Sequence, residues 1–134
     1  MEESFELGNT LDAPSLARQV VRAVLGRWGM WAVVEDAVLI ASELVANAVV
    51  HAGGARRLTL GSEVGECLRI EVSDGDDRPP VRANSSEDAL SGRGLNIIFA
   101  LASAWGAVTG PDGSGKTVWA ELDERGDIPS PTAL

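Results

Sequence analysis

Residues 35–51 constrain the fold more than any other part of the sequence, because this long segment lacks glycine and proline and is mostly apolar. Apolar side chains on most sides of a helix predict that it is nearly buried. The paired glycines Gly53 and Gly54 follow and are expected to end the helix. Its apolar residues include Val38, Leu39, Ile40, Ala41, Leu44, Val45, Ala46, Ala48, Val49 and Val50.

Three polar residues of this segment, Glu43, Asn47 and His51, are spaced four apart and therefore form one stripe on the helix. A buried carboxylate costs on the order of several kcal/mol unless it is paired or lines a wet cavity. The stripe is therefore expected to face a ligand cavity, although an ordinary exposed polar edge is the alternative.

Such a cavity would suit phosphate chemistry. Asn47 would offer an amide oxygen to Mg²⁺, and Glu43 would act as a general base toward a hydroxyl or water that attacks a terminal phosphate. For His51, at the helix end, a capping or packing role is favoured over a catalytic one.

The preceding segment predicts a strand and a helix. Residues 4–7 alternate polar and apolar side chains, as a half-buried strand does. Asp12 is expected to cap a helix that has Pro14 in its first turn, with Gly26 or Gly29 at its end.

After Gly54 the apolar period changes to two, which predicts a hairpin of strands near residues 58–60 and 68–73 with a turn near Gly65. Asp74 continues the parity of Ile70 and Val72, so its carboxylate is expected on the buried side, where it needs a hydrogen-bond partner. The exocyclic amine of adenine would be such a partner. The alternative is that Asp74 only begins an Asx turn with Gly75.

Residues 74–91 lack periodicity and are interpreted as a surface loop. Gly92, Arg93 and Gly94 then precede a third helix that begins near Leu95 and ends near Gly106. Glycines before a helix free backbone N–H groups to hold phosphate oxygens, but they are also common in simple turns.

Two closing strands are expected at residues 105–109 and 117–122, with residues 123–134 as a frayed tail. The fold class is therefore α+β, a two-layer sandwich with a mixed, mainly antiparallel sheet covered on one face by about three helices. With 134 residues, the chain is expected to form one domain over 1–134.

Residues 110–117 match the spacing of a P-loop, with Gly110 followed by Gly115, Lys116 and Thr117. A P-loop must open a helix, whereas residues 118–122 alternate like a strand. We therefore interpret this motif as a hairpin turn.

Composition excludes several functional classes. A net charge of −9 disfavours nucleic-acid binding, which depends on Lys and Arg neutralising phosphates. No apolar run approaches the roughly 18 residues of a membrane helix, and the N-terminus is acidic rather than basic. The single cysteine, Cys67, cannot form an internal disulfide. A cytoplasmic protein without a membrane partner is expected.

Three motifs together resemble those of the Bergerat-fold (GHKL) ATPases. The segment from Glu43 through Asn47 to His51 resembles their N box, and Asp74-Gly75-Asp76 falls at their adenine-binding box. Gly92-Arg93-Gly94-Leu95 resembles their second glycine box. With the Gly115-Lys116-Thr117-Val118 ending, the sequence is most similar to the anti-sigma-factor serine kinases.

This resemblance implies ATP and Mg²⁺ as cofactors. It implies that Asn47 coordinates magnesium, that Glu43 is the base for phosphoryl transfer and that Asp74 recognises adenine. It further implies that Gly92 and Gly94 contact phosphate and that Thr117 supports adenine binding; Gly75, Arg93 and Leu95 belong to the same boxes. A sigma factor and a serine-bearing antagonist protein are the implied partners, with a homodimer as the usual assembly.

The adenine-binding box departs from the family pattern, because Asp76, Asp77 and Arg78 stand where glycines are usual. Negative charge near a triphosphate is unfavourable unless it points away or a cation intervenes. A non-catalytic module that sequesters a transcription regulator is therefore an alternative to the kinase. A sensor histidine kinase is disfavoured, because no helical dimerisation segment with a phosphoacceptor histidine is present.

Overall fold

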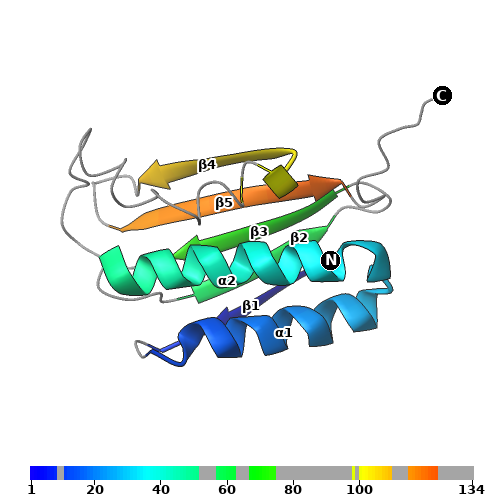
Figure 1. Ribbon diagram of the computed structural model, residues 1–134, viewed down its shortest axis with the longest axis horizontal. Coiled ribbons are helices and arrows are strands. Elements are labelled where there is room, and N and C mark those ends of the chain that lie inside the picture. Colours follow the sequence, from blue (N-terminus) through cyan, green and yellow to red (C-terminus); the bar gives the residue numbers. More distant parts are fainter. Residues whose placement is uncertain are drawn as a thin grey trace.

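A computed structural model describes residues 1–8, 11–51, 57–62, 67–74, 98, 100–109 and 115–123. Among these residues, five strands form one sheet, and two long helices lie together on one of its faces (Figure 1). This is the predicted α+β sandwich.

The strands are β1 (Glu2–Glu6), β2 (Arg57–Ser62), β3 (Cys67–Ser73), β4 (Ala104–Thr109) and β5 (Lys116–Asp123). Their order across the sheet is β1-β2-β3-β5-β4, and every neighbouring pair is antiparallel. The sequence analysis expected a mixed sheet. Among the described strands parallel pairing does not occur, because β5 lies between β3 and β4, which run in the same direction.

Helix α1 (Ala13–Trp28) begins and ends close to the predicted positions. Asp12 occupies the N-cap position, but its side chain makes no cap hydrogen bond, contrary to the prediction. Its backbone is helical (φ −83°, ψ −8°), whereas a capping side chain requires an extended backbone to reach back to the first turn. At the other end Gly29, with φ 75°, adopts the left-handed conformation that terminates the helix, and Gly26 lies inside it.

A short 3-10 turn, η1 (Trp31–Val33), leads into α2 (Val34–His51), which matches the predicted buried helix. The predicted third helix falls largely outside the described residues, of which Ile98, Ala100 and Leu101 are helical. This helix does not extend to Gly106 as expected, because β4 begins at Ala104.

The core lies between the helices and one face of the sheet. Helix α2 packs on β3 and β5, and α1 packs beside α2 toward the β1 edge (Figure 1). Each large apolar side chain fully buried there contributes about 1.5–3 kcal/mol relative to an exposed one. The fully buried core residues include Val21, Leu25, Ile40, Val45, Leu58, Leu60, Leu68, Ile70 and Ile98.

Ion pairs on the surface attach α1 to its neighbours. Arg22 binds Glu35 of α2 at 2.8 Å, and Arg27 binds Glu3 of β1 at 2.6 Å. The arginine hydrogen bonds lower the pKa of Glu35 and the pKa of Glu3 below their ordinary values.

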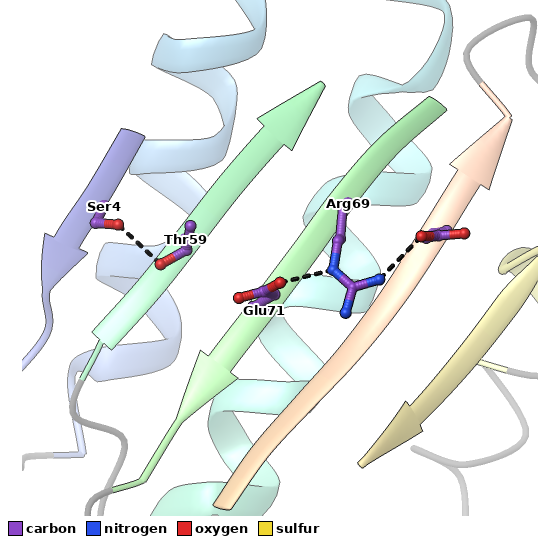
Figure 2. Close-up of polar contacts among 5 residues, drawn as sticks. Ser4, Thr59, Arg69 and Glu71 are labelled. Atoms are coloured by element: carbon purple, nitrogen blue, oxygen red, sulfur yellow. Dashed lines mark hydrogen bonds and ion pairs between the residues drawn. The ribbon is translucent and has the colours of Figure 1, made fainter. Parts of the chain in front are cut away.

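No described helix covers the other face of the sheet, and its polar side chains form hydrogen bonds with one another (Figure 2). Ser4 and Thr59 share a hydrogen bond of 2.8 Å between β1 and β2. Arg69 donates to Glu71 at 2.6 Å and to Glu121 at 2.9 Å. We refer to Arg69, Glu71, Glu121 and Trp119 as the outer-face cluster.

Trp119 completes this cluster. The Arg69 guanidinium lies 4.3 Å from the centroid of the Trp119 ring. On the other side of Trp119, a Cβ atom at Gly106 would meet the indole at 3.0 Å, so the ring lies against this glycine. Partial burial acts to lower the pKa of Arg69, but the hydrogen bonds to Glu71 and Glu121 outweigh it and the pKa is raised.

Candidate nucleotide site

Helix α2 carries the three residues of the predicted polar stripe, and the structure describes the side chains of two of them. Glu43 and Asn47 are both partly buried. The Nδ2 atom of Asn47 is buried without a hydrogen-bond partner among the described residues. A buried polar group left in this state costs about 1–3 kcal/mol. This nitrogen is therefore a candidate for a hydrogen bond to a ligand.

The Asn47 amide also fits a hard cation. Turning the amide over about its last side-chain bond exchanges Nδ2 and Oδ1, so the same position can present an oxygen. Mg²⁺ is usually held by one or two protein oxygens together with phosphates and water. Within the described ranges, no three His, Cys, Asp or Glu side chains gather to hold a metal without such help.

Asp74, directly after β3, is only 9% exposed, as strand parity predicted for the buried side. Its backbone N–H donates to the carbonyl oxygen of Lys116 at 3.1 Å. The backbone N–H of Lys116 in turn donates to Oδ1 of Asp74 at 3.1 Å. The start of β5 therefore fixes the position of this carboxylate.

The fold places these residues at one end of the same layer. The C-terminal end of α2, the end of β3 and the start of β5 lie at the same end of the molecule (Figure 1). Because α2 packs on β3 and β5, Asn47 and Asp74 lie on the same side of the sheet. Glu43 is one helical turn before Asn47, toward the middle of the layer.

Thr117 lies on the opposite side of the sheet. It pairs with Ser73 in continuous register, and its parity is opposite to that of the buried Ala120 and Leu122. The structure therefore does not bring Thr117 to the Asp74 side. The adjacent residue, Lys116, has the inward parity.

The remaining predicted residues cannot be placed. Gly75, Gly92, Arg93, Gly94 and Leu95 lie outside the described residues, as does the side chain of His51. Lys116, near the end of the P-loop-like motif, begins strand β5 and not a helix, so the rejection of a P-loop is confirmed.

A comparison with known families decides the identity of the fold. A sequence model of the histidine kinase-like ATPase domain matches residues 8–122. The chain belongs to this family. The matched region contains helices α1 and α2, strands β2, β3 and β4, all of β5 except its last residue, and every predicted site residue.

A solved structure agrees with this assignment. One chain of the SiaB–SiaC complex from Pseudomonas aeruginosa superposes with a TM-score of 0.60 over 90% of this chain and 89% of that one. The two sequences are 13% identical, so the likeness concerns the fold. No curated protein matches the sequence.

As a histidine kinase-like ATPase domain, the chain binds ATP. The buried Asp74 and the buried amide nitrogen of Asn47 lie on the side of the sheet that α2 covers. In the part of the chain that the structure describes, no helix is long and apolar enough to cross a bilayer.

Sequence reasoning missed Lys116. The strand alternation does indicate its position, since Lys116 precedes Val118, Ala120 and Leu122 at intervals of two and so shares their inward face. The hydrogen bond of its N–H to Asp74 was not predictable, because it joins residues 42 positions apart in the chain.

Proposed function

We propose that this histidine kinase-like ATPase domain binds Mg-ATP and transfers the terminal phosphate to a serine of an antagonist protein, as an anti-sigma-factor kinase. The observation that carries the proposal is the buried amide nitrogen of Asn47, which has no hydrogen-bond partner among the described residues and lies on the same side of the sheet as Asp74. Membership of the ATPase family supports ATP as the nucleotide, and the polar stripe of α2 contains residues suited to binding its phosphates.

In this proposal each residue has one task. Asp74, held by the Lys116 N–H, accepts a hydrogen bond from the exocyclic amine of adenine. Asn47 contributes the protein ligand to magnesium, which supplies charge stabilisation for the phosphates when bound. Gly75, Gly92, Arg93, Gly94 and Leu95 stay assigned to the nucleotide by resemblance.

Glu43 is the proposed general base. It removes the proton from the acceptor serine as the serine oxygen bonds to the γ-phosphorus and the bond from that phosphorus to the bridging oxygen breaks. ADP is the leaving group, and Glu43 holds the proton until it passes to water. The half-buried position of Glu43, one turn from Asn47, is consistent with this role.

The solved relative suggests a partner protein. That structure contains a complex of SiaB with SiaC, which supports a regulatory role carried out through protein association. For this chain, the partners we propose are a sigma factor and an antagonist with an acceptor serine.

The test is transfer of labelled phosphate from ATP to a small antagonist protein of the same organism, with and without Mg²⁺. We expect magnesium-dependent labelling of a serine in the acceptor, lost in Glu43→Ala. Full transfer by Glu43→Ala would remove Glu43 from the mechanism.

The second candidate function is a non-catalytic module that sequesters a transcription regulator, favoured by Asp76 and Asp77 at positions where glycines are usual. Tight partner binding that ATP does not alter, with no phosphate transfer, would support this function instead of the kinase.

A further inference from the structure

Lys116 is next to Asp74, the residue that we assign to adenine recognition, and it is the single lysine of the chain. It is the first residue of β5 and follows Gly115, whose φ of 76° turns the backbone into the strand. Residues with side chains rarely adopt this φ, so Gly115 helps to fix where β5 begins.

The register makes Lys116 and Asp74 direct neighbours across β3 and β5. Each backbone bonds to the other residue: the Asp74 N–H donates to the Lys116 carbonyl, and the Lys116 N–H donates to Oδ1 of Asp74, both at 3.1 Å. Side chains directly opposite on antiparallel strands have Cβ atoms about 4.5–5.5 Å apart. One flat ligand edge can therefore touch both side chains.

Lys116 also faces inward. It shares the parity of Val118, which packs on the core, and of the buried Ala120 and Leu122. Its side chain is partly buried, although a lysine at a strand end is normally exposed. Its ammonium is a donor on a flexible four-carbon stem and has no acceptor.

We propose that Lys116 is a second residue that recognises adenine. It donates a hydrogen bond to N1 of adenine, while Asp74 accepts one from the N6 amine. This inference rests on the proposed nucleotide site. Adenine presents a donor (N6) next to an acceptor (N1), which matches a carboxylate next to an ammonium. Guanine presents the opposite order, O6 as acceptor and N1–H as donor, and is mismatched at both positions.

The pair therefore sets base specificity. A site built to bond a ligand atom rejects an analogue that lacks it, because the buried protein group is then left unpaired. With Asp74 alone, the site reads one position of the base. With Lys116 as well, it reads two, which strengthens the preference for ATP over GTP.

The experiment measures calorimetric Kd values for ATP and for 1-deaza-ATP, in which C–H replaces N1, on wild type, Lys116→Met and Lys116→Arg. We expect 1-deaza-ATP to bind wild type about tenfold to a hundredfold more weakly than ATP. In Lys116→Met the two Kd values should differ by less than about threefold, and the Arg variant should restore part of the difference.

Arg22→Met is the matched control, since it removes one positive charge from the exposed α1–α2 pair, at the far end of α2 from Asp74. It should keep the wild-type ratio. Thermal unfolding of each variant establishes that the fold is intact.

The outcomes separate the two proposals. If wild type binds ATP but the ratio of the two Kd values is the same in Lys116→Met, the proposed hydrogen bond from Lys116 to N1 is wrong, whereas the proposed nucleotide site is kept. A loss of affinity for both nucleotides by the same factor would assign Lys116 to holding Asp74 and would equally overturn the inference. If wild type binds neither nucleotide, both proposals fail.

Discussion

Arg69 and Asn47, on opposite faces of the sheet, differ in how their polar groups are bonded. On the uncovered face, Arg69 bonds to both Glu71 and Glu121 and stacks on Trp119 (Figure 2). On the helix-covered face, the buried amide nitrogen of Asn47 has no hydrogen-bond partner among the described residues. Paired polar groups stabilise a surface by themselves, whereas an unpaired buried group is stabilised by what binds to it. This difference is the reason we place the proposed nucleotide site on the covered face.

The largest expected effect concerns Glu43 of the covered face. Glu43→Gln keeps the shape of the side chain but removes the base, so we expect the rate of phosphate transfer to fall about a hundredfold to ten-thousandfold. Single-turnover transfer of labelled phosphate measures this rate.

Glu71→Gln is the matched control on the uncovered face, because it makes the same chemical change in the outer-face cluster. Its transfer rate should stay within about twofold of wild type, since general-base catalysis needs the carboxylate within reach of the reacting proton. Equal losses in the two variants would contradict the distinction between the faces.

The second effect is on stability in the absence of nucleotide. Asn47→Leu replaces a buried amide nitrogen that has no partner among the described residues by an apolar group of similar shape. The free energy of unfolding should therefore rise by about 1 kcal/mol, while the gain in ATP affinity from Mg²⁺ is lost. Urea unfolding measures the gain. A fall in stability would mean that Asn47 is already bonded in the free protein.

Some features of the fold and of the candidate site follow from the sequence, and others do not. The buried helix and the hairpin were predicted well, because periods of 3.6 and two are local properties of residues 35–51 and 58–73. The inward position of Asp74 followed from the same alternation and is confirmed by its burial.

The failures concern the backbone and long-range register. Asp12 makes no side-chain cap because its own backbone is helical, which residue type alone does not reveal. Thr117 was assigned by resemblance, but the register with Ser73 puts it on the opposite side of the sheet. The bond of the Lys116 N–H to Asp74 depends on how two distant strands align.

A smaller effect is expected on the uncovered face. Arg69→Met removes the cation that joins Glu71, Glu121 and Trp119, so the free energy of unfolding should fall by about 0.5 kcal/mol with ATP affinity unchanged. Arg57→Met, which breaks a more exposed pair with Glu6, should cost less. Loss of ATP binding in Arg69→Met would connect the outer-face cluster to the site.

The most direct test of the account is the magnesium dependence of ATP binding in wild type and Asn47→Ala, measured by calorimetry. We expect wild type to bind ATP more tightly with Mg²⁺ than without, and Asn47→Ala to lose this gain while keeping its affinity for metal-free ATP. The same magnesium gain in both proteins, or no ATP binding by wild type, would contradict the assignment of the covered face as a nucleotide site.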